Sequence, residues 1–303
     1  MSLSDEIKAK ALQLGFDACG IAKAELLADD ARTLQTWLNK GYHGNMSYLE
    51  NHFDKRTNPQ LLVNGAQSVV VVLLNYFPAQ LQPESAPQIA KYAYGKDYHF
   101  IIKEKLKQLQ AFIDGQAPNE SMVYCDSAPV LERRWAQRAG LGWIGKSGLL
   151  IHPTLGSYCL IGELITTLPL DYDTPQKEHC GTCTACIKAC PTEALSAYEV
   201  NANRCISYLT IEHRDTISDE FTSRMGNRLF GCDACLDACP WNKKAKAHHT
   251  AELEPHEQLF TLDWEHFSRS TFKQIFKHSA LERAGYQKLK KRLEVILPHD
   301  EVQ

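Results

Sequence analysis

The sequence has no long hydrophobic run. Its longest apolar stretch, Val69 to Leu74, is far shorter than a membrane-spanning helix requires. Its first residues, Met1-Ser-Leu-Ser-Asp-Glu, lack the basic and apolar regions of a secretion signal. These absences exclude a membrane-spanning class and predict a cytoplasmic protein.

The sequence also lacks an excess of charge of one sign. Lysine and arginine number 33 and acidic residues 36, which gives a net charge of -3. A protein that coats nucleic acid through bulk charge is basic, so any such partner would have to meet a local patch. Hydrophobic residues at 44% and charged residues at 23% are typical of a globular chain, which excludes disordered and fibrous classes.

Cysteine is abundant, but its number is odd and no export signal precedes it, which argues against a disulfide framework. Eight of the 11 cysteines fall between Cys180 and Cys239, and only Cys19, Cys125 and Cys159 lie outside. This concentration predicts a metal centre.

Three stretches of different composition divide the chain into residues 1–170, 171–242 and 243–303. In the first, apolar spacing predicts helices over 5–14, 34–38, 100–113 and 130–139, and strands over 16–22, 68–75, 121–125, 149–152 and 158–167. The second stretch holds the cysteines, and the third is predicted to be a polar helical tail. We expect an α/β fold with a mixed sheet, in which the all-apolar strand 68–75 is covered on both faces.

The cysteine spacing is typical of iron–sulfur proteins. Cys180-Gly-Thr-Cys183-Thr-Ala-Cys186-Ile-Lys-Ala-Cys190-Pro191 follows C-x2-C-x2-C-x3-C-P, in which the last cysteine ligates the other cluster of a two-cluster ferredoxin. A second motif, Cys232-Asp-Ala-Cys235-Leu-Asp-Ala-Cys239-Pro240, is one cysteine short at its front, and Cys205 is the nearby candidate.

We therefore predict two [4Fe–4S] clusters. The first thiol set is Cys180, Cys183, Cys186 and Cys239, and the second thiol set is Cys190, Cys205, Cys232 and Cys235. The alternative is structural zinc, since paired C-x2-C spacings also form four-thiolate sites. Zinc does not explain three cysteines at equal intervals or two Cys-Pro endings.

A glycine-rich stretch, Gly140-Leu-Gly-Trp-Ile-Gly-Lys-Ser147, matches two nucleotide-binding patterns, G-x-G-x-x-G and G-x-x-x-x-G-K-S. Both need a strand before the glycines and a helix after them. The predicted order here is reversed. We therefore expect a tight loop whose backbone approaches some ligand closely, and not a phosphate site.

Together with the cysteine motif, several stretches resemble the epoxyqueuosine reductase family: residues 41–46, 55–59, 94–99, 126–132 and 140–146, in consistent order over about residues 10 to 242. The resemblance implies base-off cobalamin in a nitroreductase-like domain, followed by a ferredoxin-like domain with two [4Fe–4S] clusters. It also implies reduction of epoxyqueuosine to queuosine at the wobble position of tRNA. Reductive dehalogenases share these modules but usually carry an export signal.

The resemblance further suggests which residues contact the corrin, namely Arg56, Lys96, Asp97, Asp126, Leu150, Ile161, Ser207 and Asp233. Arg56 and Asp126 lie in the clearest motifs. Asp97 and His99 match the start of a D-x-H-x-x-G cobalamin motif, but position 102 is isoleucine, so a solvated turn pair is the better interpretation.

Asp126 is the predicted catalytic residue. It follows a predicted buried strand, and in an apolar pocket its carboxyl group would keep its proton. Loss of an epoxide oxygen as water needs a general acid, and the resemblance gives Asp126 that role. From the sequence alone, an N-cap for a helix beginning near Pro129 is the alternative. Cys125 is either a core cysteine or a thiol near the cobalt.

A tRNA anticodon loop has to be bound through phosphate contacts. The predicted contacts are Arg214, Lys243 and Lys244, and further candidates are Arg133, Arg134, Arg138, Lys246, Arg283, Lys288, Lys290, Lys291 and Arg292. Each patch could instead be a solvated helix face. Longer family members append helical repeats, and because this sequence stops at Gln303 we expect that module to be absent.

Two rival functions stay open at this point. One is a cytoplasmic cobalamin-dependent reductase of a small halogenated or epoxide substrate, which would be indifferent to tRNA. The other is a non-catalytic iron–sulfur electron carrier, which would hold no corrin. For the leading function we expect a monomer that is served by an unidentified low-potential electron donor.

Overall fold

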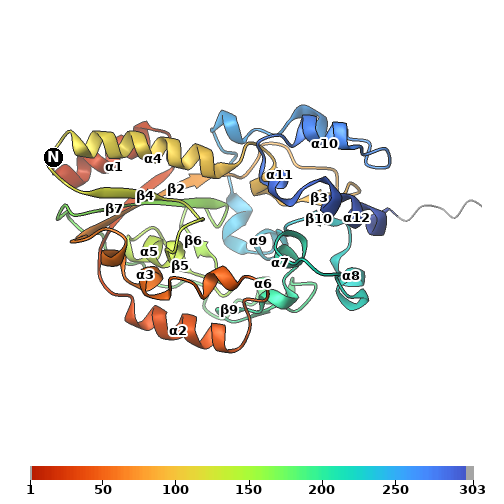
Figure 1. Cartoon of the computed structure of the whole chain (residues 1–303), viewed down its shortest axis with the longest axis horizontal. Helices are drawn as coiled ribbons and strands as arrows, with labels where there is room; N and C mark the ends of the chain where they lie inside the picture. The colour runs from red at the N-terminus through yellow and green to blue at the C-terminus, as the bar shows by residue number, and fades with distance from the viewer. Residues whose placement is uncertain (1, 298–303) are drawn as a thin grey trace, which may run out of the picture.

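The computed structural model describes residues 2–297. A sheet with helices on both faces forms one lobe, at the left of Figure 1, and the cysteine region and the C-terminal helices form the other. The helices are α1 (Leu3–Gln13), α2 (Ala28–Asn39), α3 (Phe53–Thr57), α4 (Tyr98–Asp114), α5 (Glu132–Arg138), α6 (Ala185–Lys188), α7 (Ile206–Ile211), α8 (Asp219–Met225), α9 (Ala234–Asp237), α10 (Arg269–Ile275), α11 (Ala280–Ala284) and α12 (Tyr286–Ile296). The strands are β1 (Ala18–Lys23), β2 (Ser68–Asn75), β3 (Gln88–Ile89), β4 (Ser121–Tyr124), β5 (Trp143–Ile144), β6 (Leu150–Ile151), β7 (Cys159–Thr166), β8 (Leu195–Ser196), β9 (Glu199–Val200) and β10 (Arg228–Phe230).

The main sheet has the strand order β1-β2-β7-β4, and all neighbouring strands in it are antiparallel. Every residue of β2 is buried. Val70, Val72 and Leu74 pack into one core with α1 and α4, whereas alternate residues such as Val71 pack into a second core with α5. The predicted α/β architecture and the double coverage of strand 68–75 are therefore confirmed, whereas the main sheet is antiparallel and not mixed as predicted.

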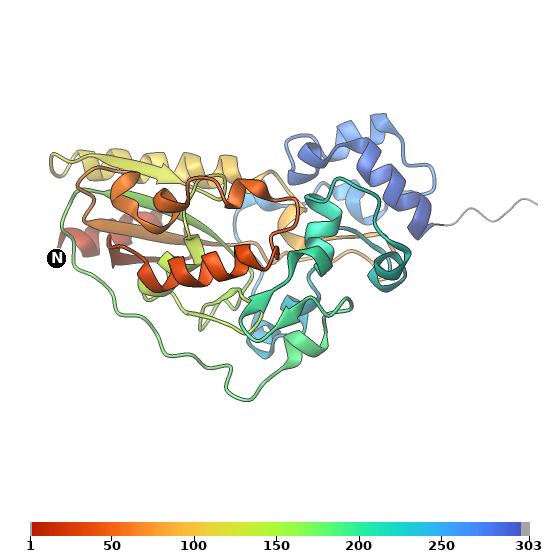
Figure 2. The same ribbon diagram turned by 60° about the horizontal axis from the view of Figure 1, so that its bottom comes forward.

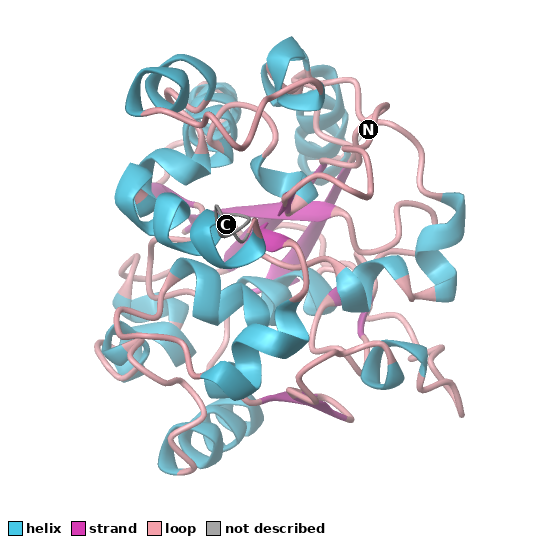
Figure 3. Cartoon of the chain, turned by 90° about the vertical axis from the view of Figure 1, so that its right-hand side faces the viewer, coloured by secondary structure: helices cyan, strands magenta, loops and turns pink. Residues whose placement is uncertain are grey.

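The second lobe is built around a short parallel pair, β3 with β10. Figure 3 views the molecule from this side, with helices and loops surrounding the strands. Ile89 and Tyr94 share a core with Phe230 and with the C-terminal helices. Residues near 89–94, which belong to the predicted first stretch (1–170), therefore pack with the predicted third stretch (243–303).

The prediction of a polar tail is wrong. The C-terminal segment carries an aromatic cluster, in which the rings of Trp264, Phe267, Phe272 and Phe276 lie within contact of one another. All four side chains are buried. The sequence does not reveal this cluster, because α10 is too short for its periodicity to stand out and Trp264 and Phe267 lie in an irregular segment before it.

An extended segment of about 18 residues links β7 to α6 and runs along the outside of the molecule (Figure 2). Asp173 fastens it to the first lobe, since the Ile21 N–H donates to Asp173 Oδ2 at 2.8 Å and the Asp173 N–H donates to the Ile21 carbonyl at 2.8 Å. Lys8 adds an ion pair to the same carboxylate at 2.7 Å. We call this segment the strap. Within residues 2–297, no helix has the length and apolar character of a membrane span.

Candidate functional site

Asp126 follows β4 and adopts a left-handed backbone conformation, with φ of 55°. The Tyr98 hydroxyl donates to its Oδ2 at 2.7 Å, and His99 Nε2 lies 3.1 Å from the same oxygen. β4 is a half-buried edge strand, and 54% of the Asp126 side chain is exposed. The predictions of a buried strand and of an apolar pocket at Asp126 are therefore wrong.

The first turn of α4 points His99 at Asp126. Asp97 is the N-cap of this helix and accepts a hydrogen bond from the His99 backbone N–H at 3.0 Å. Its Oδ1 also lies 2.6 Å from His99 Nδ1. The predicted turn is present, but it is half-buried and not solvated. Both imidazole nitrogens face carboxylates, an arrangement that suits the doubly protonated ring.

Asp97, His99 and Asp126 shift one another's pKa values. Burial alone would lower the pKa of His99, but hydrogen bonds and charge from Asp126 and Asp97 raise it to about 9. Burial alone would raise the pKa of Asp126, but hydrogen bonds from His99 and Tyr98, and the charge of His99, lower it. At neutral pH the proton therefore resides on His99 and not on Asp126, because the hydrogen bonds outweigh the desolvation that the sequence-based prediction assumes.

This arrangement predicts a pH dependence of stability. Because the folded protein raises the pKa of His99 from about 6.5 to about 9, the stabilisation is complete below about pH 6.5 and is lost as pH rises towards 9. We expect the free energy of unfolding to fall more steeply across this window in the unsubstituted protein than in His99→Gln. Urea denaturation at a series of pH values measures the difference. His249→Gln, at an exposed position, is the control, and parallel curves for His99→Gln and the unsubstituted protein would contradict the prediction.

The N-cap alternative for Asp126 is excluded, since α5 begins at Glu132 and its N-cap position is Leu131. The Asp126 backbone N–H instead donates to the carboxyl group of Glu132. Cys125 is fully buried, and its Sγ lies 3.5 Å from the Ile161 carbonyl oxygen. These contacts are those of a core cysteine.

Arg56 offers an unpaired donor beside this site. The residue is 8% exposed, its guanidinium donates to the Tyr48 carbonyl at 3.1 Å, and its Nε has no partner among residues 2–297. Burial raises the pKa of the Tyr48 hydroxyl, and the charges of Asp126 and Arg56 act on it in opposite directions. A buried donor without a partner suits a ligand rich in amide carbonyls, such as a corrin, and Arg56 therefore fits that group.

The other predicted corrin contacts differ in environment. Asp233 accepts hydrogen bonds from Lys91, through the backbone N–H at 2.8 Å and Nζ at 3.4 Å. Burial raises the pKa of Tyr92, and the charges of Asp126 and Asp233 raise it further. Leu150 and Ile161 are buried in the core against α5. Ser207 is half-buried on α7, and Lys96 is exposed.

The structure brings seven of the eight clustered thiols into two groups. In the first thiol set, Cys186 lies near Cys239 and Cys183, and burial together with these neighbouring thiols raises its pKa. In the second thiol set, burial and the thiols of Cys232, Cys205 and Cys190 raise the pKa of Cys235. The α6 and α9 helices that carry the two motifs pack against each other.

The spacing of these thiols does not suit zinc. Four sulfurs at 2.3 Å from one zinc ion would be about 3.8 Å apart. In the described part of the chain, no three cysteine sulfurs lie within 4.8 Å of one another. The sulfurs are therefore farther apart than ligands of one zinc ion would be.

The glycine-rich loop encloses Cys180. It follows α5 and precedes β6, with β5 inside it, so the predicted reversed order is confirmed. A Cβ on Gly145 would lie 3.5 Å from the Cys180 Sγ, and Lys146 Nζ donates to the carbonyls of Gly181 at 2.5 Å and Cys183 at 3.0 Å. The loop thus supports the first thiol set.

The basic candidates for tRNA contact separate into engaged and free groups. Arg134 and Arg138 form ion pairs with Asp30 at 3.0 and 2.8 Å, and Arg133 donates to the Gly148 carbonyl. Arg283, Lys288 and Arg292 are likewise held by Glu212 or by backbone carbonyls. These six side chains have partners within the fold, although Arg133 and Arg283 are also exposed. The other exposed candidates are Arg214, Lys243, Lys244, Lys246, Lys290 and Lys291.

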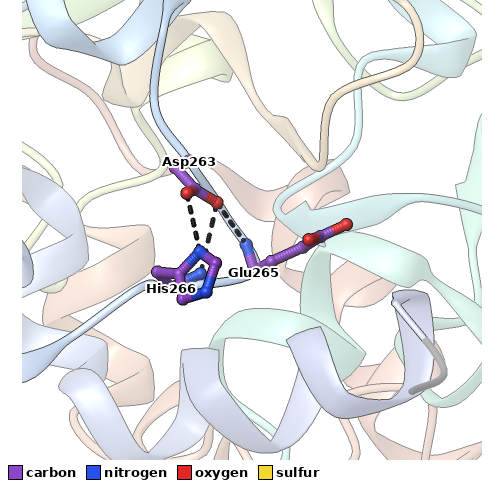
Figure 4. Close-up of side chains that lie close together, drawn as sticks. All are labelled: Asp263, Glu265 and His266. Atoms are coloured by element: carbon purple, nitrogen blue, oxygen red, sulfur yellow. Dashed lines mark hydrogen bonds and ion pairs between the residues drawn. The ribbon is translucent and has the colours of Figure 1, made fainter. Parts of the chain in front are cut away.

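One further group of potential ligands, Asp263, Glu265 and His266, lies on the surface (Figure 4). His266 Nδ1 is 2.7 Å from Asp263 Oδ2, and the backbone N–H groups of Glu265 and His266 donate to Asp263 Oδ1. These contacts form a local turn and account for the proximity of the three side chains.

Comparison with known proteins gives consistent similarities. A family model described as epoxyqueuosine reductase QueG, DUF1730, matches residues 56–127, and one described as a 4Fe-4S double cluster binding domain matches residues 179–242. The epoxyqueuosine reductase of Leadbetterella byssophila is 50% identical over 292 residues, which are 96% of this chain and 97% of the relative. That of Vibrio cholerae is 39% identical over 306 residues, 96% of this chain and 82% of the relative.

Solved structures agree with this. A crystal structure of epoxyqueuosine reductase with an epoxyqueuosine-modified tyrosine tRNA stem loop has a TM-score of 0.88 and 31% identity, covering 97% of this chain and 80% of that one. The Bacillus subtilis enzyme, with its catalytic aspartate loop swung out of the active site, has a TM-score of 0.89 and 31% identity, with coverage of 97% and 81%.

Proposed function

Because this chain belongs to the epoxyqueuosine reductase family, we propose that it reduces epoxyqueuosine to queuosine at the wobble position of tRNA, with cobalamin and two [4Fe–4S] clusters. The observation that carries the proposal is the convergence of Tyr98 and His99 on one oxygen of Asp126. The overall change adds two electrons and two protons to the epoxide and yields an alkene and water.

Asp126 acts as the general acid in this proposal and draws its proton from His99. The imidazolium holds a proton at Nε2, 3.1 Å from Asp126 Oδ2. Asp97 stabilises the charged ring from the opposite side. As negative charge develops on the departing oxygen, the proton passes to it through Asp126. In a structure of the Bacillus subtilis relative, its catalytic aspartate loop is swung out of the active site. We propose that residues 125–127 of this chain form the equivalent loop and move in the same way.

The thiol sets hold the clusters as the cysteine spacing predicts, with Cys180, Cys183, Cys186 and Cys239 on one and Cys190, Cys205, Cys232 and Cys235 on the other. The match to a double-cluster family supports this assignment. When bound, cobalamin supplies the low-valent metal chemistry that breaks the carbon–oxygen bond. Arg56, with its unpartnered Nε, would hold the corrin beside Asp126, and Lys96, Asp97, Leu150, Ile161, Ser207 and Asp233 stay proposed contacts.

The test is anaerobic reconstitution of the full chain with iron, sulfide and cobalamin, followed by mass analysis of nucleosides from tRNA that contains epoxyqueuosine. Queuosine formation supports the proposal. Bound corrin without action on tRNA would favour a reductase of a small substrate, and absence of corrin binding would favour an electron carrier. The division at residues 170 and 242, the monomeric state, the cytoplasmic location and the separate electron donor stay part of the proposal.

We expect tRNA to be bound partly through Arg214, Lys243 and Lys244, which are exposed. In Lys243→Gln/Lys244→Gln, the slope of log affinity against log salt should decrease by about 0.7–0.9 for each phosphate that is no longer bound by a lysine. Fluorescence anisotropy with a labelled anticodon stem loop measures the slope. Lys23→Gln, on the exposed face of β1, is the control, and an unchanged slope in the double variant would remove these lysines from the interface.

A further inference from the structure

A fully buried carboxyl group, Glu163, and a half-buried one, Glu132, lie behind the Asp126 loop. Glu163 stands in the middle of β7, paired with Tyr124 of β4 and Val71 of β2, and is 0% exposed. Neither of its oxygens accepts a hydrogen bond from an N–H or hydroxyl group of residues 2–297. The carboxyl group that faces it is that of Glu132, the first residue of α5, and α5 packs against β7. Two carboxyl groups that face each other away from water do not both ionise, so one of them keeps its proton.

Glu132 connects this pair to the catalytic loop. It is the first residue of α5, and its carboxyl group accepts the backbone N–H of Asp126. That contact is made at the position where the backbone is in the left-handed region, which is unfavourable for a residue with a side chain. Tyr98 and His99 hold the Asp126 side chain, and Lys103 Nζ donates to Ser127 Oγ at 3.0 Å, but Glu132 is the side chain that holds the Asp126 backbone N–H. Glu132 therefore has the geometry to fix the backbone of Asp126.

We propose that Glu132 and Glu163 share one proton and that the pair acts as a latch, with Glu132 as the positioning residue that holds the Asp126 loop over the site. Loss of the shared proton leaves two negative charges in one buried space. Glu132, the less buried of the two, is then repelled from Glu163 and releases the Asp126 N–H. This inference rests on the proposed role of Asp126.

The surrounding charges are consistent with a single negative charge on the pair. Burial raises the pKa of both carboxyl groups, and the charge of Asp126 acts in the same direction. Arg133 on α5 and His99 on α4 act in the opposite direction on Glu132. The Cys125 thiol also faces the pair, but burial raises its pKa, so it stays neutral.

The first test observes the shared proton directly in the reconstituted full-length protein. Infrared difference spectroscopy should show the carbonyl stretch of a protonated, buried carboxyl group at neutral pH, which disappears on titration to alkaline pH. The band should be absent in Glu163→Gln and in Glu132→Gln, and present in Glu120→Gln, at an exposed surface position. Absence of the band from the unsubstituted protein, or its survival in both variants, overturns the proposal.

The second test follows the loop. Amide hydrogen exchange of the peptide around Asp126, corrected for intrinsic rates, should rise between about pH 6 and pH 10 in the unsubstituted protein. In Glu163→Gln the side-chain amide donates to the Glu132 carboxylate without a shared proton, so this rise should be absent. A pH response that is the same in both proteins overturns the proposal.

Kinetics separate positioning from binding. Glu132→Ala should lower kcat by about 10- to 100-fold with KM for tRNA unchanged, since a displaced catalytic group costs rate and not affinity. Glu132→Gln keeps the acceptor oxygen and should stay within about threefold of the unsubstituted enzyme at neutral pH. An unchanged kcat in Glu132→Ala overturns the role of Glu132. If Glu132→Ala does not fold, the infrared and hydrogen-exchange measurements on the glutamine variants test the proposal in its place. Because those two readouts need no turnover, failure of the reductase assay would overturn the proposed function and leave the latch testable.

Discussion

Asp126→Asn is expected to lower the rate of queuosine formation by about 10²- to 10⁴-fold, the range associated with loss of a general acid. Asparagine preserves the size of the side chain and can still accept the Tyr98 hydrogen bond. It cannot receive a proton from His99 and pass it to the substrate oxygen. Bound iron should stay unchanged, because Asp126 is not among the proposed cluster ligands. Cobalamin should also stay bound, because seven other corrin contacts are proposed and asparagine keeps the size of the Asp126 side chain. Single-turnover assays with prereduced enzyme measure the chemical step itself.

A matched control is Asp215→Asn, at an exposed position in the second lobe. It should turn over like the unsubstituted enzyme. Normal single-turnover rates in Asp126→Asn would remove Asp126 from the chemistry. Loss of cobalamin from that variant would instead assign the residue to cofactor binding.

Serine substitutions in the cysteine region should each remove one cluster and leave the other. We expect Cys239→Ser and Cys190→Ser each to lower iron from about eight to about four atoms per chain, with loss of turnover because the electron path is interrupted. The two variants should lose different clusters, because Cys239 lies among the first thiol set and Cys190 near Cys235 in the second. Iron analysis and low-temperature electron paramagnetic resonance measure both points.

Cys159→Ser is the control for a cysteine outside both sets. Its thiol lies on β7, and burial raises its pKa, so it does not provide an available thiolate. Iron content should be unchanged. Loss in Cys239→Ser of the same paramagnetic resonance signal that is lost in Cys232→Ser would contradict the crosswise assignment.

Sequence patterns predict the first lobe because its elements are long or uniformly apolar. The unbroken run of β2 requires coverage on both faces, and the reversed order around the glycine loop excludes a phosphate site. The cysteine spacing is equally informative, since ligand geometry constrains it directly. These features depend on residues that are close together in the chain.

The local chemistry of the site could not be predicted in the same way. The apolar strand before Asp126 predicts a protonated carboxyl group, but its protonation depends on His99, which is 27 residues away in the sequence. The pairing of Glu132 with Glu163 depends on the register of β7 beside β4. Similarly, the aromatic cluster of the tail assembles from α10 and the irregular segment before it, and neither shows a clear apolar face alone.

The strap has a consequence for association between copies of this chain. β1 is an outer strand of the main sheet, and unpaired outer strands can pair with the same strand of another molecule. Asp173 occupies both the N–H and the carbonyl group of Ile21, and the Asp17 carboxylate accepts the Asn75 N–H at the end of the neighbouring strand. Asp173→Ala would leave the Ile21 N–H without its acceptor at the outer edge of β1, so the strap also covers a position where a second copy of the chain could begin to pair.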